Sequence, residues 1–285
     1  MKLTRRHLAA AAALLAFLVP AAACSVQISE RQLLRPMPGG TLTQEAVSAV
    51  APAYRVTRQT VTAADGTKLH SVLLRQRRAR GTILYFGGNG YTIGRFGAAT
   101  AAIIAPLGMD LMLVDHRGYG LSEGRPTADS IEADGLAAFD HLARLPGMSA
   151  STIIVHGQSL GSFIAGHVAA NRPTAGVVLE SSVTTTEDWV ASQMGGKPIK
   201  VTIDPVLRGR GNLREIAAID EPLLLIVGSN DRTTPPRLSE ALYRASPLPA
   251  SAKTLAIIPG AGHNDAVAKP EAIAAYRQFL ARALR

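Results

Sequence analysis

Short apolar runs that alternate with helical patterns constrain the fold of this chain more than any other feature of its sequence. The runs are rich in Leu, Ile and Val, which is typical of strands buried on both faces. They cover residues 81–86, 111–114, 153–155, 177–179, 223–227 and 254–258. Helical patterns lie near residues 96–105, 128–145, 160–171, 236–245 and 267–284. The alternation predicts an α/β fold with a mostly parallel central sheet and helices on both faces.

A hairpin is expected at the start of this sheet. Residues 56–62 and 68–76 alternate between apolar and polar side chains around Asp65-Gly66, a dipeptide that favours a tight turn. The chain has 285 residues, 47% of them hydrophobic and 18% charged, and one globular domain over residues 55–285 is the expected body. In a parallel sheet, active residues gather at the carboxyl ends of the strands. The motifs below all follow predicted strands.

A serine lies where one predicted strand gives way to a helix. It is the centre of Gly157-Gln158-Ser159-Leu160-Gly161. Glycines two residues before and after a serine let the chain cross itself closely in a sharp turn, which is the pattern of a nucleophile elbow. Such a turn holds the Ser159 hydroxyl clear of the sheet. It also directs the main-chain N–H of Leu160, the first helical residue, toward a developing oxyanion.

A serine hydroxyl needs a base that removes its proton and a carboxylate that orients the base. His263 follows the last apolar run in a glycine-rich loop, and Asp231 follows the run before it. The chain order Ser159, Asp231, His263 is the order that a nucleophile elbow of this kind requires. The sequence therefore predicts a catalytic triad of these three residues. A triad of this kind works without a metal or a cofactor, and none is expected here.

Two other acids stay open as partners of the histidine. Glu180 ends the run at 177–179, and Asp265 lies two residues after His263. Asp231 itself has a structural alternative, because aspartate also favours Asx-turns and helix N-caps.

A second oxyanion donor is expected in the loop after the run at 81–86. This loop reads Gly87-Gly88-Asn89-Gly90, and its glycines let main-chain N–H groups approach a developing charge. The main-chain amide of Asn89 is the predicted donor. Farther along, residues from about 183 to 219 lie between two predicted strands, where they can form a short lid over the site.

These motifs together resemble serine hydrolases of the α/β-hydrolase superfamily, most closely the Bem46/ABHD13/ABHD17-type branch. The resemblance rests on the elbow, on the loops that carry Asp231 and His263, and on the loop 115–124, which reads DHRGYGLSEG. It implies the α/β-hydrolase fold with a short lid. It also implies a serine hydrolase, similar to carboxylesterases and thioesterases, that cleaves an ester or thioester of a small acyl molecule through an acyl-enzyme.

The oxyanion loop departs from the family pattern. The family has His-Gly-Asn there, whereas this chain has Gly87 in place of the histidine, so the means of steadying the loop is in question. Asp115 and Arg117 are expected to hold loops together. Two other functions remain open, an amidase or peptidase of the same fold and a catalytically silent scaffold, because fold alone does not define activity.

The N-terminus is typical of an export signal over residues 1–23. Three basic residues precede an apolar stretch at 8–19 that is too short for a permanent membrane span, and small residues follow at 21–23. Residues 4–8 also resemble a twin-arginine signal, so the export route stays open. Residues 24–54, with prolines and glycines at 36–40, are expected to be a flexible tether.

Cys24 is the one cysteine of the chain and directly follows these small residues, as the lipidated cysteine of a bacterial lipoprotein does. The expected location is the cell envelope with a lipid anchor at Cys24, in the outer membrane if the cell is Gram-negative. Ordinary cleavage, giving a periplasmic or secreted protein, is the alternative.

The net charge of +9 does not indicate nucleic-acid binding, because the chain has few aromatics and no basic stripe interleaved with them. The sequence indicates no oligomeric state.

Overall fold

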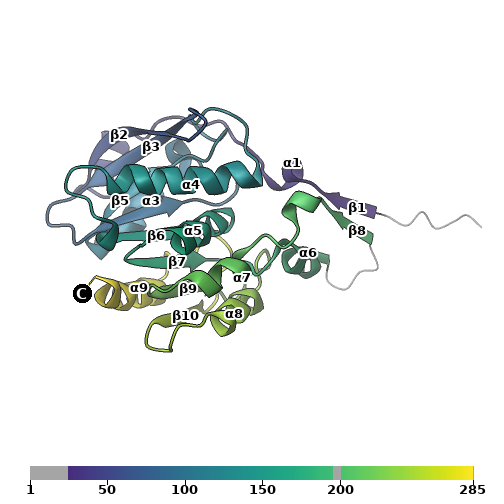
Figure 1. The fold of residues 1–285 in the computed structure, drawn as a ribbon. Coiled ribbons are helices and arrows are strands. Elements are labelled where there is room, and N and C mark those ends of the chain that lie inside the picture. The colour runs from purple at the N-terminus through teal and green to yellow at the C-terminus, as the bar shows by residue number, and fades with distance from the viewer. Residues whose placement is uncertain (1–24, 195–199, 285) are drawn as a thin grey trace, which may run out of the picture.

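The computed structural model describes residues 25–194 and 200–284. Within them, eight strands form one sheet in the order β10-β9-β7-β6-β4-β5-β3-β2 (Figure 1). The strands are β2 (Arg55–Thr62), β3 (Lys68–Arg75), β4 (Thr82–Phe86), β5 (Asp110–Val114), β6 (Ile153–Gln158), β7 (Gly176–Glu180), β9 (Leu223–Gly228) and β10 (Lys253–Ile258). The β2–β3 hairpin pairs antiparallel and joins β5 antiparallel, whereas the other pairs are parallel. The predicted mostly parallel sheet is confirmed.

Helices cover both faces of this sheet, as the sequence predicts. The larger ones are α3 (Ile93–Ile104), α4 (Ala128–Ala143), α5 (Leu160–Asn171), α8 (Pro236–Ala245) and α9 (Pro270–Ala283). Successive side chains of a strand point to opposite faces, so β4 contributes Ile83 and Tyr85 to one core and Leu84 and Phe86 to the other. The first core includes residues of α3 and α9, and the second includes residues of α4, α5 and α8.

The N-terminal segment differs from the flexible tether that the sequence predicts. It forms β1 (Ser25–Ile28), α1 (Glu30–Leu33) and α2 (Gln44–Ser48), and Leu34, Leu42 and Val47 are buried against the body. Prolines and glycines at 36–40 indicate flexibility locally. However, apolar side chains on both sides of them remove enough surface from water to hold the segment in place. Cys24 and the predicted signal peptide lie outside the described residues.

The predicted lid region lies between β7 and β9. Its described residues form α6 (Thr186–Met194), β8 (Lys200–Ile203) and α7 (Asn212–Glu215), with a 3₁₀ turn at Pro205–Leu207. Strand β8 pairs in parallel with β1, so the lid and the N-terminal segment share a small two-stranded sheet. Figure 1 shows β1, α1, α6 and β8 gathered at one end of the molecule. None of the helices in the described ranges is both long and apolar enough to cross a membrane.

Candidate active site

The chain makes a sharp turn at Ser159, between the end of β6 and the start of α5. The φ of Ser159 is 52° and its ψ is −115°, a conformation that residues with a side chain rarely adopt. A Cβ at Gly157 would lie 2.1 Å from the carbonyl oxygen of Gly161, and a Cβ at Gly161 would lie 2.0 Å from that of Phe86. Glycine is therefore required on both sides of the serine, as the elbow pattern predicts.

The structure brings Ser159, His263 and Asp231 together from the ends of three strands. The Nε2 atom of His263 lies 3.0 Å from the Ser159 Oγ atom, and its Nδ1 atom lies 2.8 Å from the Asp231 Oδ2 atom. These distances are within hydrogen-bond range for both links. The arrangement has the geometry in which an imidazole accepts the serine proton while a carboxylate fixes its tautomer.

Asp231 is held by the turn that follows β9. Its Oδ1 atom accepts hydrogen bonds from the main-chain N–H groups of Thr233 and Thr234, and its Oδ2 atom accepts one from the Thr234 hydroxyl. Burial disfavours the charged carboxylate, but the hydrogen bonds from His263 and Thr234 outweigh burial and lower the pKa of Asp231. The group beside the imidazole is therefore an anion.

The two rival acids have other partners. The Glu180 Oε2 atom lies 3.2 Å from the Nε2 atom of His156, and both side chains are buried beneath the elbow. Asp265 accepts a hydrogen bond from the Gly262 N–H and forms an ion pair with Lys269 at 3.0 Å. Among the described residues, Asp231 is the acid whose carboxylate contacts the His263 ring, so the geometry favours Asp231 as its partner.

Both predicted oxyanion donors line the cavity beside Ser159. Among the described residues, the main-chain N–H groups of Leu160 and Asn89 have no hydrogen-bond acceptor. A free N–H is expected for Leu160 because the first residues of a helix lack acceptors within it. Gly88 lies close to Ser159, since a Cβ at Gly88 would be 3.4 Å from the Cβ of Ser159. Two free main-chain N–H groups thus belong to residues that line the same cavity as Ser159.

The loop after β4 is restrained by residues other than the one at position 87, where the sequence has glycine in place of the family's histidine. A Cβ at Gly87 would lie 2.1 Å from Cγ of Tyr91, so the Tyr91 ring fills the space of a side chain. The Gly87 carbonyl oxygen is 2.7 Å from Nε2 of the buried His116. Tyr91 and His116 therefore restrain the loop without a side chain at position 87.

Asp115 and Arg117 make the loop-holding contacts that the sequence predicts. Asp115 accepts main-chain hydrogen bonds from Ile93 and Leu121, and burial raises its pKa to about 6 despite these bonds. Arg117 forms ion pairs with Asp65 at 2.5 Å and with Asp134 at 2.7 Å. These contacts join the β2–β3 hairpin, the loop after β5 and α4.

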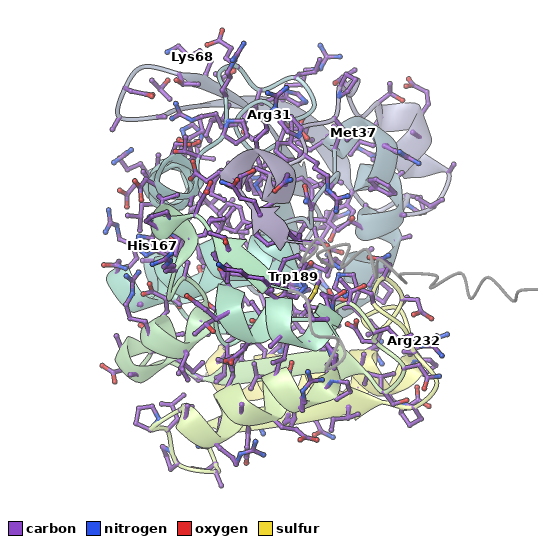
Figure 2. The ribbon with its side chains drawn as sticks, turned by 90° about the vertical axis from the view of Figure 1, so that its right-hand side faces the viewer. Arg31, Met37, Lys68, His167, Trp189 and Arg232 are labelled. Atoms are coloured by element: carbon purple, nitrogen blue, oxygen red, sulfur yellow. The ribbon has the colours of Figure 1, made fainter. Side chains whose placement is uncertain are left out.

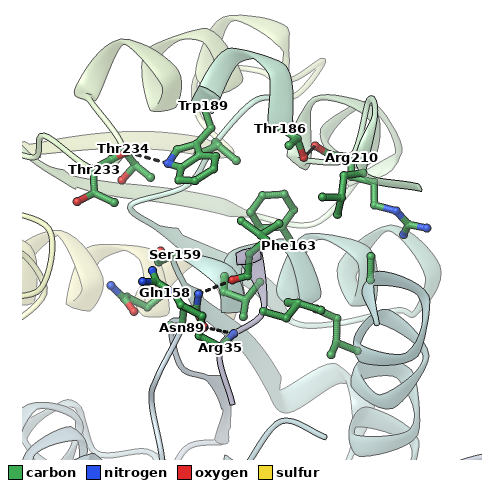
Figure 3. Close-up of a pocket in the computed structure, with 18 of the residues that line it drawn as sticks. Arg35, Asn89, Gln158, Ser159, Phe163, Thr186, Trp189, Arg210, Thr233 and Thr234 are labelled. Atoms are coloured by element: carbon green, nitrogen blue, oxygen red, sulfur yellow. Dashed lines mark hydrogen bonds between the residues drawn. The ribbon is translucent and has the colours of Figure 1, made fainter. Parts of the chain in front are cut away.

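A cavity of about 340 Å³ opens beside Ser159 (Figure 3). Its walls come from the N-terminal segment, α4, α5 and the lid, and most of the lining is apolar. The apolar lining includes Leu33, Leu34, Ile131, Leu160, Phe163, Val183, Trp189 and Leu207. Figure 2 shows Arg31 of α1 and Trp189 of α6 on the same face of the molecule. Within the described ranges, no group of three or more His, Cys, Asp or Glu side chains could hold a metal ion.

Of the charged residues in the cavity wall, two form an ion pair with each other and one forms none with any described residue. Glu132 and Arg210 form an ion pair at 2.7 Å, and Arg210 also pairs with Asp129. Arg35 is exposed and forms no ion pair with another described residue. The site is therefore an apolar pocket with a neutralised acid and a free cation at its wall.

An eight-stranded, mostly parallel sheet with a strained serine after β6 defines the α/β-hydrolase fold. Comparison with solved structures agrees. The Pyrococcus furiosus esterase Pf2001 superposes with a TM-score of 0.71 over 88% of this chain and 98% of that chain, at 20% sequence identity.

Comparison of sequences shows a protein family and several individual proteins to which this chain is similar. The family model described as serine aminopeptidase, S33, matches residues 77–208. The chain is 33% identical to the uncharacterized protein Rv2307c of Mycobacterium tuberculosis, over 59% of this chain and 58% of that protein. It is 30% identical to the α/β-hydrolase domain-containing protein WAV2 of Arabidopsis thaliana, over 63% of each. Bem46 of Schizosaccharomyces pombe is 27% identical over 60% of this chain and 59% of that protein.

The resemblance that the motifs indicate is confirmed: the chain has the α/β-hydrolase fold and is similar in sequence to Bem46-like proteins. The matched region spans less than two thirds of the length of these curated relatives.

Proposed function

We propose that the protein is a serine hydrolase that cleaves a carboxylic ester or thioester. The observation that carries the proposal is that Ser159, His263 and Asp231 are joined by hydrogen bonds and that Ser159 and His263 line an apolar cavity. The esterase fold of Pf2001 supports the same reaction class.

In the proposed mechanism, Ser159 attacks the acyl carbonyl carbon while His263 takes the hydroxyl proton. Asp231 stabilises the imidazolium that forms, and the N–H groups of Leu160 and Asn89 donate to the oxyanion. His263 then gives its proton to the leaving alcohol or thiol, which departs from the acyl-enzyme. Water repeats these steps and releases the acid.

The cavity supports an ester or thioester substrate over a peptide with a free N-terminus. An aminopeptidase needs an anion to bind the substrate's ammonium group. The carboxylate in the described lining is Glu132, which Arg210 already neutralises. The remaining charge at the wall, on Arg35, would repel a cation. The volume is near the lower end of ligand pockets, which supports a small or medium acyl group.

A fluorophosphonate probe tests the reaction class directly, because it labels activated serines. The wild-type protein should be labelled, and Ser159→Ala should lose both the label and all ester hydrolysis. Ser251→Ala changes an exposed serine ahead of β10 and should label as the wild type does. An unlabelled wild type would favour the silent scaffold instead. Wild-type turnover of p-nitrophenyl esters of graded length, beside an acyl-thioester and an aryl amide, then separates ester, thioester and amide cleavage.

A lipid anchor on Cys24, in the cell envelope, is the localisation that we propose. Its support is the signal-like sequence before this cysteine. Intact-mass measurement of the membrane-extracted protein should give a chain that starts at Cys24 and carries acyl groups. An unmodified Cys24 would leave a periplasmic or secreted enzyme.

A further inference from the structure

The Asn89 side chain, which the proposed mechanism does not use, is bound to two other segments of the chain. Its Nδ2 atom donates a hydrogen bond to the Leu33 carbonyl oxygen. Its Oδ1 atom accepts two, from the Arg35 main-chain N–H at 3.1 Å and from the Tyr119 hydroxyl at 2.8 Å. Figure 3 shows the bond from Arg35 to Asn89 beside Ser159. Both the amide nitrogen and the amide oxygen of the Asn89 side chain are thus hydrogen-bonded.

The partners of this carboxamide are themselves fixed. Tyr119 is fully buried in the loop after β5. Leu34 lies between Leu33 and Arg35, the two residues whose main chain binds the Asn89 carboxamide; it is 4% exposed and packs in the core with residues of α4 and α5. We call residues 25–40 the N-terminal strap. Asn89 is therefore tied to an ordered part of the fold.

Both ends of the strap are attached as well. At one end, β1 pairs with β8 of the lid. At the other end, the Met37 carbonyl oxygen accepts a hydrogen bond from the Gly120 N–H at 2.8 Å. Between them, Glu30 accepts a hydrogen bond from the Ala128 N–H at the start of α4. The strap thus runs from the lid, past α4, to the loop that contains Tyr119.

The loop around Asn89 needs such an anchor. Gly88 and Gly90 flank it, and glycine has more backbone freedom than any other residue. The Asn89 N–H donates usefully only when it is aimed at the oxyanion, because hydrogen bonds weaken steeply as they bend. A side chain held at three points fixes the direction of the peptide group next to it.

We infer that the Asn89 side chain is a positioning group, and that the N-terminal strap completes the active site by aiming the Asn89 main-chain N–H at the oxyanion. The inference rests on the proposed function. It assigns a role in the reaction to a segment that lies outside the sheet and outside the triad. Removing one oxyanion donor lowers kcat about 10²–10³-fold in serine hydrolysis. A misdirected donor should therefore lower kcat about 10-fold or more and change KM much less.

A pair of variants at Arg35 isolates the strap's hydrogen bond. Arg35→Pro removes the main-chain N–H that donates a hydrogen bond to the Asn89 side chain, whereas Arg35→Ala keeps this N–H. Both substitutions remove the guanidinium group. The residue before this position meets the restriction that proline places on it, because Leu34 is extended at φ −91° and ψ 108°. We expect kcat of Arg35→Pro to be about 10-fold or more below that of Arg35→Ala, with similar KM values and melting temperatures.

Asn89→Ala gives a second test in case the proline variant does not fold. It removes all three side-chain hydrogen bonds and keeps the main-chain N–H, so kcat should fall at least as far as in Arg35→Pro. Hydrogen exchange of amides 87–91, which needs no activity, should be faster in Asn89→Ala and Arg35→Pro than in Arg35→Ala.

The outcomes separate this inference from the proposed function. If the wild type is not labelled by the fluorophosphonate, the hydrolase proposal fails, and the exchange rates alone decide whether the strap holds the loop. If Asn89→Ala matches the wild type in kcat and in exchange, the inference is overturned. An equal fall in kcat and rise in KM in all three variants would also overturn it, because it would indicate general loosening of the pocket.

Discussion

Ser159 has a positive φ, and residues with a side chain pay roughly 1–3 kcal/mol for such a conformation. The cost falls on the proposed nucleophile itself. Neighbouring contacts hold the turn, since the Ser159 N–H donates to the Glu180 carbonyl oxygen and Ser162 donates to the Ser159 carbonyl oxygen. The elbow therefore holds the partly exposed Ser159 side chain in a fixed place, and the turn is strained locally.

The role of Asp231 is tested by Asp231→Asn, which keeps the shape but removes the charge that fixes the imidazole tautomer. We expect kcat to fall about 10³–10⁴-fold, measured with a p-nitrophenyl ester. Asp265→Asn is the matched control, because its amide oxygen can still accept the Gly262 hydrogen bond. Its kcat should stay within a few fold of the wild type. Full activity of Asp231→Asn would mean that another acid, such as Glu180, orients His263.

Asp115 should make stability depend on pH. Its folded pKa of about 6 is above the value of about 3.9 for an unfolded chain, so the folded chain binds the proton more tightly between these values. Ionisation of Asp115 therefore favours unfolding as pH rises through this window. Asp115→Asn does not ionise.

The free energy of unfolding of the wild type minus that of Asp115→Asn should change with pH. It should be largest near pH 4 and should fall by on the order of 2–3 kcal/mol by pH 7. Urea unfolding of both proteins at several pH values measures it. A constant difference would contradict the raised pKa.

The lid helix α6 is attached to the loop that follows β9. The Trp189 Nε1 atom donates to the Thr233 carbonyl oxygen at 3.1 Å, and the Gln193 amide donates to the same oxygen at 2.9 Å. Thr233 is next to Thr234, which holds Asp231. Helix α6, which contributes Trp189 to the cavity wall, is thus attached to the loop that contains Asp231.

Trp189→Phe and Trp189→Ala separate the two roles of the indole. Phenylalanine keeps an aromatic wall and loses the hydrogen bond, whereas alanine loses both. We expect KM for the preferred acyl ester to rise several-fold in Trp189→Ala and less in Trp189→Phe, because burial of the acyl group depends on apolar area. Equal KM values in all three proteins would show that the acyl group does not contact Trp189.

Several elements could be predicted from local sequence, with errors at their ends. The apolar runs correspond to β4, β5, β6, β7, β9 and β10, and Asp65-Gly66 marks the hairpin turn. Helix α3 begins at Ile93 rather than near 96, directly after Thr92. Helix α9 begins at Pro270 rather than 267, since proline suits the first turn of a helix.

Strands β1 and β8 could not be predicted in the same way. Each has four residues that alternate in character, and each is stabilised by pairing with a partner far away in sequence. Helices α1 and α2 are too short to show helical periodicity. The cavity wall formed by Leu33, Leu34 and Arg35 was missed for this reason. The Leu33-Leu34 pair is the only local signal of burial there.

At the scale of the whole molecule, the N-terminal segment belongs to the main core. Leu42, Val47 and Tyr54 pack with residues of α3 and β5, and the Tyr54 hydroxyl donates to the Met109 carbonyl oxygen at 2.7 Å. The hydrolase fold is therefore closed on this side by residues that precede its first strand in the main sheet.

The substitution Leu42→Ala measures how much the packing of this segment contributes to the free energy of unfolding. Leu42 is 3% exposed, so the substitution should lower the free energy of unfolding by about 2–5 kcal/mol. Leu213→Ala changes a leucine that is 41% exposed and should cost much less. Both values come from chemical unfolding monitored by circular dichroism. If Leu42→Ala costs no more than Leu213→Ala, residues 24–54 act as the flexible tether that their composition indicates.

The packed start of the chain has a practical consequence for anyone who prepares this protein. A recombinant version trimmed to the hydrolase homology would begin after residues that line the pocket and fill the core, and we expect it to be poorly folded. An affinity tag is better fused after α9, which ends on the side of the molecule away from β1 (Figure 1). Inhibitors are then screened against a protein whose pocket is intact.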